Sequence, residues 1–187
     1  EDGNLSNVEA MVTRAHRDGR WNHSPSSRGG ENSRPDWWIY AEADQTAATL
    51  AMGGADFVVP DESGPDVAVT SANWISDFVD PRGHGEVIPG ITADGSPVFN
   101  WPESDTAKCN QWKNGYHSVE HALVMTLFSS WMNDVPFRLY FALPADQADS
   151  ALLRPYFFQG KLAERTNFGD IDGTDLQKIR GSFVDLF

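Results

Sequence analysis

An almost wholly apolar run, Ala122 to Met132 (ALVMTLFSSWM), constrains the fold of this chain more than any other stretch. Apolar residues on nearly every side predict a helix, beginning near His117, that neighbouring elements cover all round. The first turns of this helix carry His117, Glu120 and His121. Because residues three and four apart share a helix face, these three side chains can point into one space. The stretch therefore predicts a buried helix whose exposed end forms a wall of an active site.

Two kinds of chemistry fit the titratable residues at the start of this helix. Residues 117–121, HSVEH, match the H-x-x-E-H pattern of inverted zinc peptidases, in which two histidines bind zinc and the glutamate is the base. That pattern needs a third ligand downstream, and no second motif supplies one, so we expect no metal and no cofactor. The alternative is metal-free proton transfer by His117, whose neutral form is favoured near a helix N-terminus. The histidines could also do no more than satisfy buried backbone groups.

Composition narrows the classes of protein that this chain can belong to. It has 187 residues, 40% of them hydrophobic and 12% aromatic, which is typical of a globular protein with a core of its own. A net charge of −13 disfavours nucleic-acid binding, because phosphate contacts require basic patches. The seven tryptophans fit either core packing or the stacking of a carbohydrate ring on indole. Cys109 is the only cysteine, so an internal disulfide is excluded.

The sequence contains no recognisable membrane or targeting segment. No apolar run reaches the length of a membrane span, and no signal peptide is visible. The first residue is Glu1 rather than methionine, so we expect a processed chain or a fragment. The compartment stays open, and a soluble chain that is secreted or periplasmic after processing fits the pattern.

Gly, Pro and Asp residues mark the boundaries between the predicted helices and strands. Helices are predicted over residues 4–15, 36–52 with Asp36 as N-cap, 65–79, and 117–132. A hairpin is predicted over residues 86–99 around Ala93 to Ser96. Beyond Asp134 the pattern changes to strands at residues 137–143 and 156–162, which we expect to pair with each other. The residues after 162 read as a peripheral segment.

Three motifs in order carry a resemblance to a known family. Residues 112–117, WKNGYH, give W-K-x-x-Y-H directly before the apolar helix. Residues 36–42, DWWIYAE, are similar to W-W-x-Q-A-E, with Tyr40 in place of glutamine. Between them, residues 78–95 are similar to a hairpin that begins F-x-D and ends D-G. From about Leu5 to Trp131 the chain therefore resembles the N-acylglucosamine 2-epimerase family, which includes cellobiose 2-epimerases and aldose–ketose isomerases.

The resemblance implies a fold and a division of the chain. The expected fold is mainly α, the C-terminal portion of an alpha/alpha toroid of the six-hairpin type with short β-hairpins, over residues 1–134. A β-containing C-terminal extension is expected over residues 135–187. The predicted helices form only part of such a ring, so the resemblance also implies an N-terminal companion chain or missing region that covers the open flank.

The family's chemistry is proton transfer at the carbon next to a sugar carbonyl, shared by two histidines. His117 matches the second of them, whereas the G-H-x-x-E motif of the first is absent, and His121 could replace it chemically. Glu120 stands where the family commonly has arginine, and it would orient His121 or raise the pKa of His117. A carboxylate there would also destabilise a neighbouring enediolate. The catalytic candidates are thus His117, His121 and Glu120, and the substrate-binding candidates are Trp38, Glu42, Trp112, Lys113 and Tyr116.

Different classes of function stay open at this point. One is a carbohydrate epimerase or isomerase with histidine acid–base chemistry. Another is a divergent, non-catalytic carbohydrate-binding or structural chain. A third is a toroid hydrolase or lyase with Glu42 or Glu120 as acid. Each reading expects a carbohydrate or a related small molecule as partner, and none expects nucleic acid or a membrane span.

Overall fold

The computed structural model describes residues 2–17, 19–21, 36–54, 66–80, 83, 87–91, 96–98 and 115–187. The chain divides into two compact units, residues 1–125 and residues 126–187, and each is described by itself. The division falls within the last helix, between Met125 and Thr126. No helix in the described ranges is long and apolar enough to cross a membrane.

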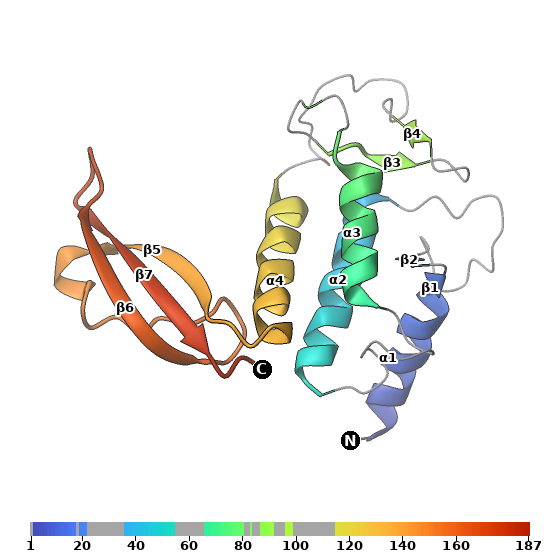
Figure 1. Ribbon diagram of the computed structural model, residues 1–187, viewed down its shortest axis with the longest axis horizontal. Helices are drawn as coiled ribbons and strands as arrows, with labels where there is room; N and C mark the ends of the chain where they lie inside the picture. The colour runs from blue at the N-terminus through green and yellow to red at the C-terminus, as the bar shows by residue number, and fades with distance from the viewer. Residues whose placement is uncertain are drawn as a thin grey trace. The chain divides into compact units, whose positions relative to one another are not determined.

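The first unit is built on helices that the sequence predicts well. They are α1 (Asp2–Ala15), α2 (Trp37–Met52), α3 (Val67–Phe78) and the first turns of α4 (Tyr116–Met132). Figure 1 shows α2 and α3 side by side. The alanines of α2 allow this close approach, because Ala41, Ala47 and Ala48 are fully buried and add little bulk between the helices. Tyr40 and Phe78 fill the space beside them, with ring centroids 5.6 Å apart.

Two short hairpins frame these helices. Strands β1 (His16–Arg17) and β2 (Arg20–Trp21) form the first, and β3 (Gly90–Ile91) and β4 (Pro97–Val98) form the second. The second hairpin lies within the predicted residues 86–99, with Ile91 opposite Pro97. The Arg20 guanidinium donates to both carboxylate oxygens of Asp77, at 2.7 and 3.1 Å, and so ties β2 to α3.

The N-termini of α2 and α3 are stabilised in different ways. The predicted N-cap of α2, Asp36, makes no side-chain capping bond, and its backbone instead bridges to Gly90, the first residue of β3. At α3 the cap is Asp66, whose carboxylate accepts from the backbone N–H groups of Ala68 and Val69. The bridge to β3 therefore takes the place of a side-chain capping bond at α2, and α3 begins two residues after its predicted start at residue 65.

The second unit contains a three-stranded antiparallel sheet in the order β5-β7-β6. Its strands are β5 (Phe137–Pro144), β6 (Lys161–Asp170) and β7 (Leu176–Val184). Phe137 pairs with Phe183, and Phe141 with Ile179, along the β5–β7 ladder. The buried face carries Phe137, Ile179 and Phe183, and the connection between β5 and β6 adds Ala148, Leu153 and Phe158 to the core.

The expected mainly α toroid is wrong. The described residues contain four helices together with the three-stranded sheet, which makes the chain a mixed α/β protein. The expected pairing of residues 137–143 with 156–162 is also wrong, because β5 pairs with β7. The segment expected to be peripheral supplies β7, the central strand, whose lysine, arginine and glutamine side chains mask its alternation with apolar residues.

The apolar run of α4 is also less covered than its composition predicts. Val124 and Leu127 are fully buried and Phe128 nearly so. Val119, however, has 68% of its surface exposed, and Met132 has 47%. The helix therefore has a buried side and an exposed side along its length. Both sides are already present in its first turns, which carry the titratable residues.

Candidate functional site

Two histidine–carboxylate pairs join α4 to α2. His117 Nδ1 lies 2.7 Å from Glu42 Oε1, and His121 Nε2 lies 2.8 Å from Asp44 Oδ2. The histidines are four residues apart and share one face of α4. The carboxylates are two residues apart on α2, so one turns toward the surface and the other toward the core. The same pair of helices thus carries one accessible and one buried histidine–carboxylate pair.

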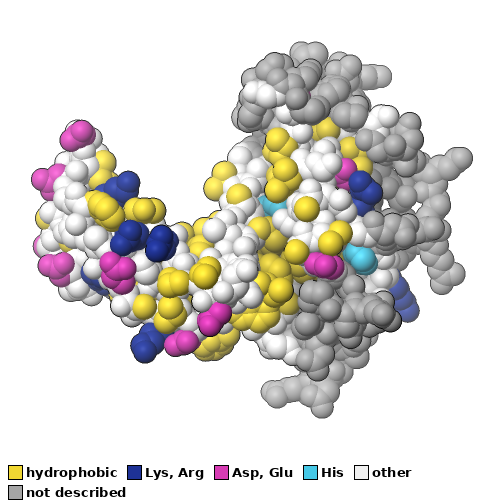
Figure 2. Space-filling view, viewed as in Figure 1, with side chains coloured by type: hydrophobic (Ala, Val, Ile, Leu, Met, Phe, Trp, Pro, Cys, Tyr) yellow, Lys and Arg dark blue, Asp and Glu magenta, His cyan; other side chains and the backbone are white. Residues whose placement is uncertain are grey.

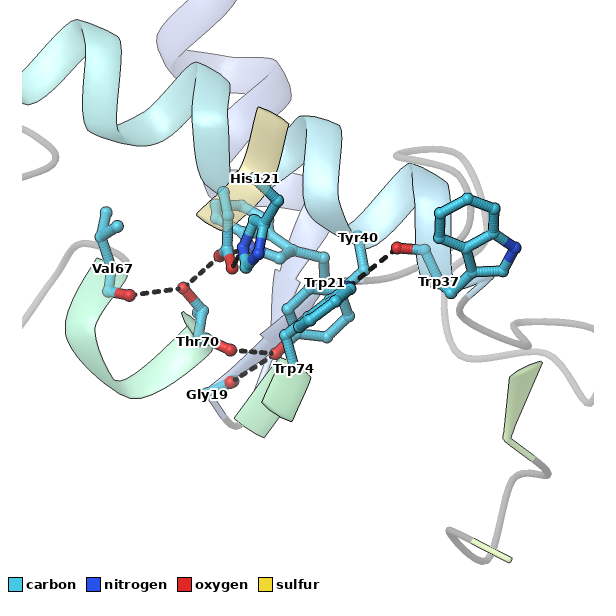
Figure 3. A network of polar contacts seen from close by, with 9 residues as sticks. Gly19, Trp21, Trp37, Tyr40, Val67, Thr70, Trp74 and His121 are labelled. Atoms are coloured by element: carbon cyan, nitrogen blue, oxygen red, sulfur yellow. Dashed lines mark hydrogen bonds and ion pairs between the residues drawn. The ribbon is translucent and has the colours of Figure 1, made fainter. Parts of the chain in front are cut away.

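The buried pair is the centre of a polar network, seen in Figure 3. Asp44 is completely buried, and its Oδ1 accepts from Trp21 Nε1 at 2.6 Å and from Thr70 Oγ1 at 2.5 Å. Its other oxygen faces His121, which stacks at a tilt on Trp74 with 4.4 Å between ring centroids. Groups from β2, α3 and α4 therefore converge on the Asp44 carboxylate of α2. Their hydrogen bonds replace those that the carboxylate would make to water if it were exposed.

Tyr40 and Trp74 extend this network to the backbone. The Tyr40 hydroxyl lies 2.9 Å from the carbonyl oxygen of Thr70 and 3.2 Å from that of Gly19. Burial raises the pKa of Tyr40 well above its usual range, and the Asp44 carboxylate adds to the shift. Tyr40 therefore stays a neutral hydrogen-bond donor. Trp74 Nε1 donates to the carbonyl oxygen of Trp37 at 2.9 Å, which ties α3 to the first turn of α2.

The accessible pair lies among aromatic rings. The side chains of His117 and Glu42 are 26% and 44% exposed, against 3% and 0% for His121 and Asp44. The ring of His117 has Trp37 and Trp38 each at 5.6 Å, and Tyr116 at 5.1 Å. Trp37 is buried, whereas Trp38 and Tyr116 expose 43% and 60% of their surface. A ligand that reaches His117 would therefore meet aromatic side chains.

The contact with Glu42 determines which ring nitrogen of a neutral His117 carries the hydrogen. An ionised carboxylate only accepts hydrogen bonds, so Nδ1 must carry hydrogen and donate it. The lone pair of the neutral ring is then on Nε2, for which the described residues supply no hydrogen-bond partner. His117 can consequently take up a proton at Nε2 while Glu42 balances the charge that develops on the ring.

The other sequence-predicted residues are distributed differently. A hydrogen bond with Glu120, one turn away on α4, raises the pKa of the Tyr116 hydroxyl. Each histidine thus has a carboxylate from α2 as its partner, and Glu120 interacts with Tyr116. Trp112 and Lys113 lie outside the described residues. Of the predicted group, the structure brings together Trp38, Glu42, Tyr116 and His117.

Sequence reasoning missed Asp44, Thr70, Trp74 and Trp21, which form the buried network. One signal was available for Asp44. It lies on the side of α2 that carries the alanines, so the helical period places an acidic side chain on a face that packs against other elements. A carboxylate in that position requires donors nearby. Their identity could not be derived, because they come from segments distant in sequence.

Comparison with known proteins does not assign the chain to a family. No family model, curated protein or solved structure matches it. Within the described ranges, no group of three or more His, Cys, Asp or Glu side chains is placed to hold a metal ion. The geometry around His117 and the motif resemblance are therefore the features that indicate a function.

Proposed function

We propose that the His117–Glu42 pair transfers a proton at the carbon next to the carbonyl group of a sugar, which makes the chain a carbohydrate epimerase or isomerase. The observation that carries the proposal is the 2.7 Å contact between His117 Nδ1 and Glu42 Oε1 at an accessible position. The W-K-x-x-Y-H and D-W-W-I-Y-A-E motifs, which resemble those of N-acylglucosamine 2-epimerases, supply the reaction class.

The reaction follows from the assigned tautomer. Nε2 of His117 removes the proton from the carbon beside the carbonyl, and the electron pair of that bond moves onto the carbonyl oxygen to give an enediolate. Glu42 accepts the Nδ1–H bond and stabilises the imidazolium that forms. Return of the proton by His117 to the neighbouring carbon, with the hydroxyl proton of the first carbon moving to the former carbonyl oxygen, gives the isomeric aldose or ketose. Inversion of the first carbon instead requires a proton on its opposite face, which solvent water supplies. His121 has no role in this scheme, because its side chain is buried and contacts Asp44.

The aromatic surroundings suit a sugar. Trp38 presents an exposed indole beside His117, and Tyr116 lies on the other side of the imidazole. Flat rings bury the apolar faces of a pyranose and leave the hydroxyl groups to polar partners. Such rings also bind a sugar without chemistry, so a non-catalytic carbohydrate-binding chain is the second candidate, favoured by the exposure of Trp38.

The test measures hydrogen exchange rather than a particular product. A panel of aldoses, including cellobiose, mannose and an N-acylglucosamine, is incubated with the chain in D₂O, and loss of the signal of the proton at carbon 2 is followed by NMR. We expect exchange with at least one sugar. In His117→Asn it should fall about 100-fold or more, the usual contribution of a general base, and added imidazole should restore part of it.

Glu42→Gln separates the two candidate functions further. It keeps the shape of the side chain but removes the charge that balances the imidazolium, so exchange should slow while sugar binding persists. If sugars bind, perturb tryptophan fluorescence and never exchange, the binding-module reading replaces the enzymatic one. Full exchange activity in His117→Asn would exclude His117 as the base.

A further inference from the structure

The sheet of the second unit has an open face on which cations and aromatic rings alternate. Successive side chains of a strand point to opposite faces, and Ile179 and Phe183 point into the core. Lys178 and Arg180 of β7 therefore point outward. Tyr140 on β5 and Phe168 on β6 flank them, with ring centroids 6.0 Å apart. Together with Arg138, which lies two residues before Tyr140, these side chains form what we call the basic–aromatic face.

The contacts within the basic–aromatic face hold its cations between the rings. The Lys178 ammonium lies 4.7 Å from the centroid of Tyr140 and 5.9 Å from that of Phe168. The guanidinium of Arg180 lies 5.5 Å from the centroid of Phe168. Tyr140 and Phe168 are nevertheless 55% and 52% exposed. The rings position the cations but leave their own outer surfaces accessible to a ligand.

The charge balance of this face is opposite to that of the chain. Acidic residues outnumber basic ones 27 to 14 in the sequence, yet here Glu164 faces two cations: it lies 3.1 Å from Arg180 and also interacts electrostatically with Arg138. Neither Lys178 nor Arg138 forms an ion pair with any described carboxylate. Figure 2 shows dark blue side chains next to yellow ones over this unit. Positive charge is thus concentrated, and only partly neutralised, on one face of an acidic protein.

Protection of a sheet edge does not account for this arrangement. Charged side chains on edge strands prevent strand-to-strand aggregation, and Arg138 on β5 could serve that purpose. Lys178 and Arg180, however, lie on the central strand, where both edges are already paired. Cross-strand stabilisation explains contact between neighbours but not the exposure of two large rings.

We propose that the basic–aromatic face binds an acidic polysaccharide, a chain of sugars that carry carboxylate or sulfate groups. The ligand's anionic groups pair with Lys178 and Arg138, and its pyranose rings lie against Tyr140 and Phe168. Nucleic acid is a poorer fit, because it carries a negative charge about every 1.7 Å of duplex, and the net charge of −13 repels so dense a charge more strongly than the sparser charge of an acidic polysaccharide. A polymer with at most about one charge per sugar matches a few dispersed cations. This inference does not depend on the activity of His117.

The experiment is gel retardation and calorimetry of the full chain with polygalacturonate. Dextran serves as the neutral polymer and single-stranded DNA as the competing anionic one. We expect retardation by polygalacturonate, weaker at higher salt, and none by dextran. Lys178→Gln and Tyr140→Ala should each weaken binding about fivefold or more. Arg154→Gln is the matched control, since it removes an equal charge from an exposed position in the connection that covers the opposite face.

Each result has a defined meaning. Circular dichroism establishes that the variants fold, and Lys178→Gln at an exposed site keeps the test valid should Tyr140→Ala unfold. The proposal is overturned if polygalacturonate does not bind, if Arg154→Gln weakens binding as much as Lys178→Gln, or if dextran binds equally well. Tighter binding of single-stranded DNA than of polygalacturonate would also overturn it and identify a nucleic-acid surface instead.

Discussion

Asp44 links four separate segments of the first unit. It receives hydrogen bonds from β2 and α3 and faces a histidine of α4, while its own backbone belongs to α2. A carboxylate without contact to water is unfavourable unless every oxygen has donors, and here both oxygens have them. The network therefore fixes the orientation of α4 relative to α2. That orientation brings His117, one turn away on α4, to Glu42 rather than to another carboxylate.

Replacing Asp44 should consequently cost much more stability than replacing Glu42. Asp44→Asn keeps the size of the side chain but leaves His121 facing an amide, and we expect a loss of roughly 3–5 kcal/mol in the free energy of unfolding. Glu42→Gln changes a half-exposed pair and should cost less than about 1 kcal/mol. Urea titration followed by tryptophan fluorescence measures both. Equal effects of the two substitutions would mean that the buried network does not organise the helices.

At the level of elements, α3 shows how a local signal sets a boundary. Asp66 accepts from Ala68 N–H at 2.9 Å and from Val69 N–H at 3.2 Å, so it satisfies donors that the first turn of a helix cannot use internally. Asp66→Ala should lower the free energy of unfolding by about 1 kcal/mol. Asp66→Asn retains the accepting oxygen and is the control. If the alanine and asparagine variants unfold at the same urea concentration, capping at this position contributes nothing.

The elements differ in how far sequence could predict them. The bounds of α2 and α4 follow from helical periodicity and from Gly53, which ends α2, because these signals are local. The pairing of β5 with β7 does not, because it joins residues about forty positions apart and competes with a nearer apolar segment. The site shows the same limit. Periodicity placed His117 and His121 together, but their partners Glu42 and Asp44 reach them only through the packing of α2 on α4.

At the level of the whole molecule, the first unit exposes apolar side chains around its accessible histidine. Trp38, Tyr116 and Val119 are 43%, 60% and 68% exposed, and the first two contact His117. We call these three residues the apolar rim. Proteins that are monomeric in solution rarely leave such side chains grouped together, because covering them is favourable. The rim therefore supports the expectation that a companion chain or a further region of the protein covers this part of the site.

The chain by itself should accordingly associate or bind an apolar dye, and Val119→Lys should reduce both effects. The substitution places a charge in the apolar rim without touching the His117–Glu42 contact. Leu152→Lys, at a residue of the second unit that is 79% exposed, is the control for a new surface charge. Sedimentation gives the mass in solution, and dye fluorescence reports exposed apolar surface. A monodisperse monomer that binds no dye would contradict the need for a companion, and an equal effect of both substitutions would place the associating surface elsewhere.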